Sequence, residues 1–397
     1  MLRKIRIAGI GCALIDNLFN NVRFRDKEIQ PYLSKNAGDG GLSPGKLVFT
    51  NEFEKFAGKT VEEVLFEVSG RKAPDTYNIG GPCIVALIHA TQLTYHLQTE
   101  VLFYGAMGND VNGINLRRLL SKTPLDIDNF AITSNTTPYT NVISDPNFAE
   151  GHGERIFINN IGAAWDFTPE HLDETFFAAD ICVFGGTALV PNIHDHLQEI
   201  LFRAKELGRF TVVNTVYDFR NEQRNPNKQW PMGENDHSYE LIDLLITDYE
   251  EALRLSGKST IEGAMEFFID KKTGAVIITH GANPITLYSS GRTMKALPVG
   301  QLPVSERVKN ELKMNPDNTG DTTGCGDNFV GGILASFVTQ MQNDQKPDLI
   351  EACAWGIISG GFACFYLGGT YFEKAPGEKS EKIKFYYQDY MDQIKNK

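Results

Sequence analysis

Short apolar runs alternate with helix-like segments along most of the chain, and this alternation restricts the fold more than any other feature of the sequence. The apolar runs have the length of buried strands and occupy residues 5–11, 101–108, 181–186, 210–216, 244–247 and 275–281. Segments with helical apolar spacing lie between several of them, at residues 82–93, 112–121, 192–207, 249–256 and 260–271. Strands that alternate with helices form βαβ units, whose strands are parallel and whose helices cover the sheet. The sequence therefore predicts a three-layer α/β fold with a parallel-rich central sheet.

Three segments interrupt the alternation. Residues 17–76 begin with a long polar stretch, and residues 130–165 contain short extended pieces. We expect these two segments to build a small β-rich lid over the site of a single domain that spans residues 1–397. Residues 217–236 are polar and contain two prolines, which predicts a surface loop.

Charge and cysteine usage exclude several classes of partner. The net charge is −12 and no block of five or six lysines and arginines occurs, which argues against a nucleic-acid partner. The six cysteines are scattered without a C-x-x-C pair, as is typical of reduced thiols in the cytoplasm. No run approaches the roughly 18 apolar residues of a membrane span, and Gly9, Gly11 and Asp16 interrupt the first run. We expect a cytoplasmic protein without a membrane partner, whose first run is a buried strand and not a signal peptide.

The stretch "DTTGCGDNFVGG" at residues 321–332 carries the strongest chemical signal. Apolar residues recur at helical spacing after Asp327, so a helix should begin near this residue. The first N–H groups of a helix lack partners, and the preceding glycines let the backbone turn them toward one place, where they can hold a phosphate. An aspartate there can take a proton from a substrate hydroxyl, as phosphoryl transfer to an alcohol requires. The same pattern is equally consistent with an aspartate that only caps a helix.

This stretch closely resembles the signature D-T-x-G-A-G-D-x-F-x-x-G of the ribokinase-like (PfkB) carbohydrate kinases, with cysteine at the alanine position. The resemblance implies that Asp327 is the catalytic base. It implies an anion hole made by the backbone of Gly324, Cys325 and Gly326. It also implies ATP contacts at Thr322, Gly324 and Gly326, and a site for a monovalent cation such as K⁺ at Asp321 and Thr323.

Further matches follow the order of the family along nearly the whole chain. For the acceptor, "GIGCALID", "NIGGPCIVAL" and the lid-strand match "GER" (153–155) imply contacts from Asp16, Gly80, Gly81 and Arg155. For the nucleotide, "TDYEEA" and "ITHGANP" imply that Asp248 and Glu251 place Mg²⁺ through water, and that Thr279 and Gly281 contact ATP. Val85 stands where family sugar kinases usually carry an asparagine that bonds the sugar, so Asn78 is a candidate to replace it.

The resemblance implies a ribokinase-like fold and an ATP- and Mg²⁺-dependent kinase that phosphorylates a primary alcohol of a sugar or sugar derivative. The closing "GGTYFEKAPGE" looks more like adenosine kinases, so a nucleoside acceptor is the alternative, with a non-catalytic ligand-binding relative as the third hypothesis. Asp218 and Arg220 loosely match a pattern of hexose and ketodeoxy-sugar kinases, and a solvated loop is an equal alternative for them. Lids of some relatives pair into dimers, which leaves open a homodimer through the lid or a lid that works within one chain.

Overall fold

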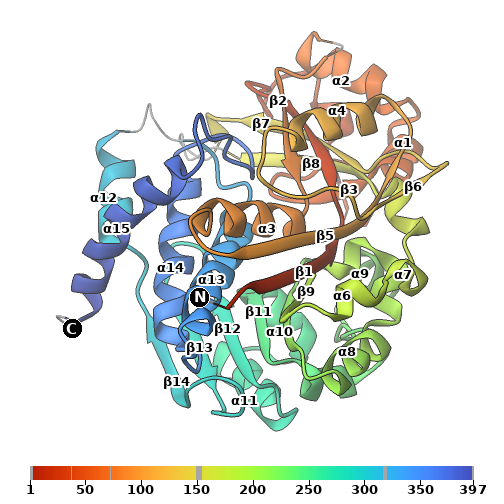
Figure 1. The fold of residues 1–397 in the computed structure, drawn as a ribbon. Coiled ribbons are helices and arrows are strands. Elements are labelled where there is room, and N and C mark those ends of the chain that lie inside the picture. Colours follow the sequence, from red (N-terminus) through yellow and green to blue (C-terminus); the bar gives the residue numbers. More distant parts are fainter. Residues whose placement is uncertain (1–2, 37, 72, 149–153, 316–319, 396–397) are drawn as a thin grey trace.

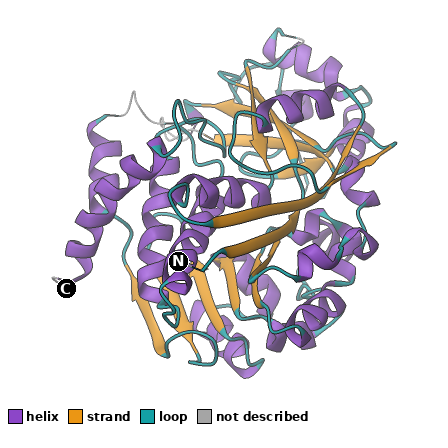
Figure 2. Cartoon of the chain, viewed as in Figure 1, coloured by secondary structure: helices purple, strands orange, loops and turns teal. Residues whose placement is uncertain are grey.

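A nine-stranded sheet crosses the centre of the molecule in the order β14-β13-β12-β11-β10-β9-β1-β5-β6 (Figures 1 and 2). The computed structural model describes residues 3–36, 38–71, 73–148, 154–315 and 320–395. The strands of this sheet are β1 (Ile5–Gly11), β5 (Thr99–Gly108), β6 (Phe130–Thr133), β9 (Ile181–Gly185), β10 (Phe210–Asn214), β11 (Leu244–Asp248), β12 (Ala275–Thr279), β13 (Ile285–Ser289) and β14 (Leu297–Leu302). All neighbours pair in parallel except β12 with β13 and β13 with β14, which are antiparallel.

Helices cover both faces of this sheet because its strands are apolar on both sides. In β1, for example, Ile5 and Ile7 join one hydrophobic core, and Ala8 and Ile10 join the other. The first core is built with α3 (Pro82–Leu93), α4 (Val111–Leu120), α12 (Glu306–Met314), α13 (Cys325–Gln342), α14 (Leu349–Ala363) and α15 (Glu378–Lys395). The second is built with α6 (Glu174–Phe177), α7 (Pro191–Asp195), α8 (Leu197–Glu206), α10 (Tyr249–Ser256) and α11 (Ile261–Asp270). The predicted three-layer α/β architecture with a parallel-rich sheet is confirmed.

A second, five-stranded sheet of order β3-β8-β7-β2-β4 lies beyond one end of the first. Its strands are β2 (Leu14–Phe19), β3 (Leu47–Phe49), β4 (Thr76–Gly80), β7 (Tyr139–Asp145) and β8 (Glu154–Asn160). A separate small core joins this sheet to α1 (Thr50–Ala57) and α2 (Val61–Ser69). Strands β3, β7 and β8 lie inside the two segments in which extra strands were expected, whereas β2 begins before the first segment and β4 begins at its last residue.

The chain crosses between the two sheets at four places. These crossings form two pairs, and the two crossings of each pair lie side by side. It enters the second sheet after β1 and returns at Gly81. A Cβ at Gly81 would lie 2.1 Å from the carbonyl oxygen of Cys12, so these two crossings touch. The chain enters again after β6 and returns at Gly162, where a Cβ would lie 2.1 Å from the carbonyl oxygen of Thr136. Gly81 has φ +113° and Gly162 has φ +48°, so both positions favour glycine.

Several predictions about single segments were wrong in detail. The piece at 130–133 pairs with β5 at the edge of the main sheet and not with the second sheet, because Phe130 packs on Phe103 with ring centroids 5.1 Å apart. Residues 17–76 contain helices α1 and α2 between their strands. The predicted helix at 192–207 divides at His196, whose backbone leaves the helical region.

Residues 217–236 are not the predicted polar surface loop. They contain α9 (Phe219–Arg224), and the sequence continues into the 3-10 helix η5 (Asp236–Leu241). Trp230 is buried against Tyr217, with ring centroids 4.7 Å apart, and its indole N–H donates to Glu222. This aromatic contact ties the segment to the body of the protein.

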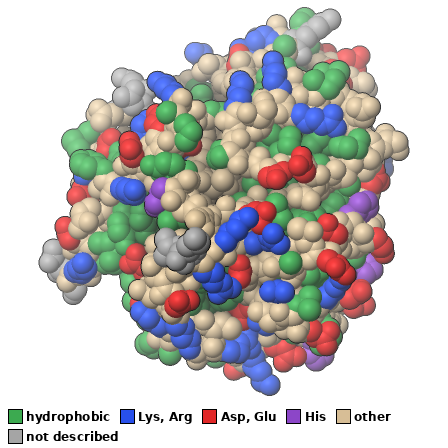
Figure 3. All heavy atoms as spheres, viewed as in Figure 1, with side chains coloured by type: hydrophobic (Ala, Val, Ile, Leu, Met, Phe, Trp, Pro, Cys, Tyr) green, Lys and Arg blue, Asp and Glu red, His purple; other side chains and the backbone are tan. Residues whose placement is uncertain are grey.

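On the face shown in Figure 3, acidic and basic side chains are intermixed and no broad field of one charge is present. Each helix in the described ranges is too short or too polar to cross a membrane.

Candidate active site

The glycine-rich turn at residues 321–324 leads directly into α13. Gly324 is the residue before the first helical turn and has φ +72°, in the left-handed region where glycine is favoured. A Cβ there would lie 2.5 Å from the Cα of Gly369, so the turn is packed against the loop that follows α14. No side chain caps this helix, and Asp327 lies in its first turn. The alternative in which Asp327 is only a capping residue is therefore wrong.

The backbone N–H groups of this turn differ in whether they donate hydrogen bonds within the protein. The Cys325 amide donates to the carbonyl of Thr322 at 3.3 Å, a turn bond at the long end of the hydrogen-bond range. The amides of Gly326 and Asp327 belong to the first helical turn, where the helix itself offers no acceptor. A Cβ at Gly326 would meet open space, so an anion can approach this part of the backbone. The Cys325 thiol lies 3.4 Å from that of Cys364.

The carboxyl groups of Asp327 and Asp16 lie close enough for the charge of Asp327 to affect the pKa of Asp16. Burial raises the pKa of Asp327 to about 6. Asp16 lies in β2 and is buried. Its pKa is raised to about 8, first by burial and then by the nearby carboxylates of Asp321 and Asp327, while Arg155 acts in the opposite direction. Near neutral pH, Asp327 is therefore ionised and able to accept a proton, and Asp16 retains its proton.

Gly80 and Gly81 border the Asp16 carboxyl. Asp16 and Asn78 are partners in the antiparallel pair of β2 and β4. A Cβ at Gly80 would lie 2.5 Å from Asp16 Oδ2, so only glycine leaves this carboxyl in place. Gly81 then begins the connection into α3. The structure thus brings the predicted acceptor residues Asp16, Gly80 and Gly81 together at the junction of the two sheets.

Arg155 reaches from β8 to the glycine-rich turn. Its guanidinium donates hydrogen bonds to the hydroxyls of Thr322 and Thr323, and one nitrogen lies 3.9 Å from Asp321 Oδ2. Asp321 Oδ1 also accepts the amides of Thr323 and Gly368. Arg155 therefore supplies a positive charge beside Asp321 and Thr323, and the role of these two residues toward a monovalent cation stays a prediction. Gly153 of the "GER" match lies outside the described residues.

The residues predicted to serve the nucleotide and metal lie at the ends of two adjacent strands. Asp248 ends β11 opposite Thr279, which ends β12, and Gly281 follows with φ +55°. Asp248 caps α10 by accepting the amide of Glu251 at 2.8 Å. The pKa of Glu251 is raised to about 8, first by burial and then by the Asp248 carboxylate, with a smaller contribution from Asp327. Asp327 is therefore near enough to Glu251 to affect its pKa, and a site shared by the metal candidates and Asp327 stays a prediction.

The predicted acceptor contact of Asn78 is replaced in this structure by contacts within the protein. Its Nδ2 donates to the carbonyl of Leu367 at 2.9 Å, and its Oδ1 accepts the amides of Ile79 and Thr370. Val85 is fully buried, and a Cβ at Gly369 would lie 3.3 Å from its side chain. Both residues therefore support the loop behind the glycine-rich turn.

The solvated-loop alternative for Asp218 and Arg220 is wrong. Asp218 is buried, and its carboxylate lies 3.5 Å from His194 Nε2, whose ring in turn bonds the hydroxyl of Thr187. Arg220 pairs with Asp195 and lies over the Trp165 ring at 5.9 Å. These contacts give both residues a place in the packed structure and leave their proposed role toward an acceptor a prediction.

Two residues of the site escaped the sequence analysis. Asn328 is buried next to Asp327 and donates to the carbonyls of Gly324 and Gly369 at 2.8 and 2.9 Å. Lys379 is fully buried and donates to Asn328 Oδ1. Asn328 could have been suspected from its place after Asp327, but Lys379 lies 51 residues further along the chain and no local pattern marks it.

Asp16→Asn is expected to stabilise the folded protein. The pKa of Asp16 lies above its unfolded value of about 3.9, so between about pH 4 and 8 the folded form holds a proton that the unfolded chain releases. This group therefore destabilises the fold progressively as the pH rises through that window. Asparagine removes the effect, and we expect a gain of at least about 1 kcal/mol at pH 7 that shrinks toward pH 4. Denaturant unfolding at several pH values measures it, and a gain independent of pH would contradict this electrostatic origin.

Comparison with known proteins agrees with the fold and the family resemblance. Residues 67–375 match the family described as pfkB family carbohydrate kinase. Similar solved structures include adenosine kinase from Schistosoma mansoni in complex with 2-fluoroadenosine, with a TM-score of 0.69 and 17% identity over 92% of this chain and 97% of that one. A probable sugar kinase from Rhizobium etli has a TM-score of 0.67 and 16% identity over 97% and 100% of the two chains. Ribokinase from Thermotoga maritima has a TM-score of 0.61 and 15% identity over 97% and 99%. No curated protein sequence matches the chain.

The family match covers more than half of the chain, and it includes the acceptor glycines, Arg155, the strand ends and the glycine-rich turn. These solved structures share the ribokinase-like fold with it. The chain belongs to the pfkB family of carbohydrate kinases.

Proposed function

We propose that this protein transfers the γ-phosphate of ATP to a primary alcohol of a sugar or sugar derivative. The observation that carries the proposal is the position of Asp327: an ionisable carboxylate in the first turn of α13, beside helix amides that have no partner in the helix. A base and an anion-binding backbone at one place are what transfer of a phosphoryl group to a hydroxyl requires.

In the proposed mechanism, the oxygen of the acceptor hydroxyl attacks the γ-phosphorus of ATP while Asp327 takes the proton of that hydroxyl. ADP then leaves. The turn at residues 324–326 receives the charge on the phosphoryl oxygens through its amides. Arg155, already at the hydroxyls of Thr322 and Thr323, adds a positive charge from the second sheet. In this proposal the second sheet acts as a lid, because Arg155 connects it to the catalytic turn.

Asp248 and Glu251 suit a divalent cation that arrives with the nucleotide. Each of the two carboxyl groups is close enough to disturb the ionisation of the other, and a cation between them and the phosphates would relieve this. Mg²⁺ usually keeps several waters and few protein ligands beside substrate phosphates. This agrees with the finding that no three acidic, histidine or cysteine side chains gather as a metal site within the described ranges. Bound Mg²⁺ would neutralise the phosphate charge, and Thr279 and Gly281 would contact the phosphates.

The acceptor would lie between Asp16, Gly80, Gly81 and Asp327. A protonated Asp16 can both donate a hydrogen bond to an acceptor oxygen and accept one, which suits a hydroxyl-bearing ring. A nucleoside, phosphorylated at its 5′ hydroxyl, is the second candidate, because a structure similar to this chain is that of an adenosine kinase with 2-fluoroadenosine bound.

An ATP-consumption screen with Mg²⁺ against sugars, sugar acids and nucleosides tests the proposal. A sugar that supports turnover bears it out, and a nucleoside that does so alone favours the second candidate. Binding of acceptors without turnover of any of them would indicate a non-catalytic relative and contradict the proposal.

Activity should depend on pH through Asp327. Because its pKa is raised to about 6, this carboxylate becomes protonated below that pH and can no longer act as a base. We expect kcat/KM to fall about tenfold per pH unit below pH 6, and to be nearly level just above it. An initial-rate profile from pH 4.5 to 8, with enzyme stability checked at each pH, measures this. A level profile down to pH 5 would contradict the assigned base.

A further inference from the structure

Lys379, near the start of α15, is a buried charged residue that the mechanism above does not use. Its ammonium donates to Asn328 Oδ1 at 2.8 Å and to the Tyr366 hydroxyl at 3.3 Å. It also lies over the rings of Tyr366 and Tyr371, at 5.3 and 5.7 Å from their centroids. Within the described parts of the chain, no carboxylate comes close enough to form an ion pair with it. A buried ammonium with only neutral partners is unfavourable unless another negative charge offsets it.

Asn328 connects this ammonium to the catalytic turn. The oxygen of its carboxamide accepts from Lys379, and the nitrogen donates to the carbonyls of Gly324 and Gly369. The Gly324 carbonyl and the Cys325 amide belong to the same peptide unit. Polarisation of a carboxamide by a charge strengthens its N–H as a donor, and a carbonyl that accepts a stronger bond makes the N–H of its own peptide a stronger donor in turn. A chain of hydrogen bonds therefore runs from Lys379 to the predicted anion hole.

We propose that Lys379 is a positioning residue for the phosphoryl transfer: through Asn328 it fixes the Gly324–Cys325 peptide and adds positive charge behind the anion hole. The proposal rests on the proposed function. The phosphate group at the turn would add a second negative charge, besides that of Glu373, to offset the buried ammonium. This arrangement would also place a positive charge on the protein side of the turn.

The groups around Lys379 determine how it responds to pH. His89 on α3 is buried, and burial together with Lys379 holds its pKa well below the usual range, so this histidine is neutral. Glu373 precedes α15 and favours the ammonium form, but burial dominates and lowers the pKa of Lys379 well below its usual value. Tyr366 and Tyr371 stay protonated, because burial raises the pKa of both hydroxyls. Lys379 therefore loses its proton at a lower pH than an ordinary lysine, while both tyrosines keep theirs.

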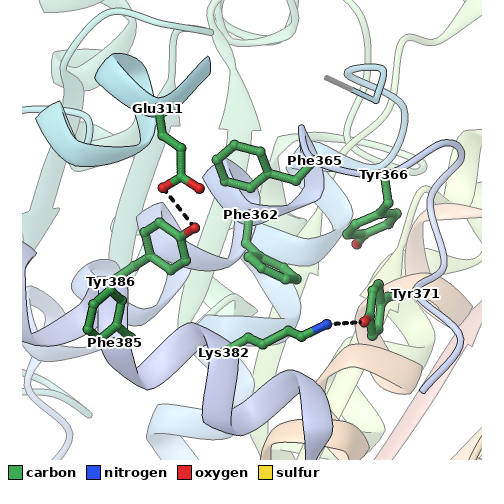
Figure 4. A pocket seen from close by; sticks show the side chains of 8 residues that line it. All are labelled: Glu311, Phe362, Phe365, Tyr366, Tyr371, Lys382, Phe385 and Tyr386. Carbon is green, nitrogen blue, oxygen red and sulfur yellow. Dashed lines mark hydrogen bonds between the residues drawn. The ribbon is translucent and has the colours of Figure 1, made fainter. Parts of the chain in front are cut away.

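Tyr366 and Tyr371 also line an open pocket (Figure 4). It has a volume of about 570 Å³, and six aromatic side chains together with Glu311 and Lys382 line it. Lys382 lies one turn after Lys379 on α15, but its side chain is 47% exposed, and it bonds Tyr371 and Glu378. Lys382 therefore offers a matched control on the same helix.

The test compares Lys379→Met with Lys382→Met at several pH values, using the acceptor found active in the screen. Removing Lys379 should lower kcat by about 10- to 100-fold and leave KM for the acceptor nearly unchanged. This fall in kcat is no larger than the fall expected when one anion-hole donor is removed. It should also abolish the alkaline decline of kcat that loss of the ammonium charge produces in the wild type. Lys382→Met should keep the wild-type kcat and profile. In Lys379→Ala, added ethylammonium should restore kcat several-fold.

Several outcomes would overturn the inference. Folded Lys379→Met with a kcat within twofold of the wild type does so, as does a loss that is equal at all pH values and not restored by the amine. Should the Lys379 variants fail to fold, Asn328→Leu breaks the same chain of bonds, and normal kcat in that variant contradicts the proposal. If the wild type itself turns over no acceptor, the proposed function fails separately. Calorimetric ATP binding then decides on Lys379: weakening by at least about threefold in Lys379→Met supports it, and equal affinity overturns it.

Discussion

Asp327→Asn should bind ATP almost as well as the wild-type protein and turn over about 10²- to 10⁴-fold more slowly, because the amide cannot accept the proton of the acceptor hydroxyl. The substitution keeps the size and shape of the side chain, so the first turn of α13 and its amides stay in place. Calorimetric binding of ATP and initial rates with a saturating acceptor separate the two effects. A loss in kcat with little change in ATP affinity is the signature of an interaction made in the transition state.

Asp348→Asn is the matched control for that experiment. Asp348 caps α14 by accepting the amides of Ile350 and Glu351, and asparagine caps helices about as well. This variant should therefore keep both its stability and its turnover. Wild-type turnover in Asp327→Asn as well would contradict the assignment of Asp327 as the base.

Gly324→Ala should be the most damaging change of a glycine in the turn. The methyl group adds the strain of a left-handed backbone, about 1–2 kcal/mol. It would also meet the Cα of Gly369 at 2.5 Å, so the turn has to move by roughly 1 Å away from the loop behind it. A displacement of that size at a catalytic group lowers rates by about 10²-fold. We expect such a loss of kcat, measured beside the unfolding free energy.

Gly208→Ala separates these two effects. Gly208 follows α8 with the same φ of +72°, but a Cβ there has no neighbour within 4 Å. This variant should lose about the same backbone stability as Gly324→Ala and none of the activity. If both variants had wild-type kcat, the packing of Gly324 on Gly369 would not position the catalytic turn.

The main sheet could be predicted because its strands are apolar on both faces. Runs such as residues 181–186 and 275–281 read as buried strands, and the observed strands end within two residues of them. At the antiparallel edge, β14 was missed for the opposite reason. β14 has no fully buried residue, so its sequence carries no apolar run to mark it.

The helices inside residues 17–76 could have been found from their caps. Thr60 and Glu63 form a capping box at the start of α2, and Gly58 and Gly70 end α1 and α2 in the left-handed conformation. The polar stretch at the beginning of the segment concealed these signals. In residues 217–236 the missed signal was Trp230, a large aromatic residue that a solvated loop has no reason to contain.

In the candidate site, too, local features could be predicted from the sequence and contacts between distant residues could not. The turn that contains Asp327 is one short stretch of sequence, so its residue types and spacing predicted a phosphate-binding helix start. The contact from Arg155 spans 167 residues to Thr322, and the one from Lys379 spans 51 residues to Asn328. Contacts of this kind arise from the packing of distant elements, and no local periodicity encodes them.

The paired crossings between the two sheets limit how the second sheet can move. Cys12 touches Gly81, and Thr136 touches Gly162, so the connections form two fixed points and not four independent tethers. Two points define an axis. A swing about that axis leaves both contacts intact, whereas sliding or twisting of one sheet past the other would break at least one of them. Arg155, carried on β8, would then travel along a single arc toward and away from the catalytic turn.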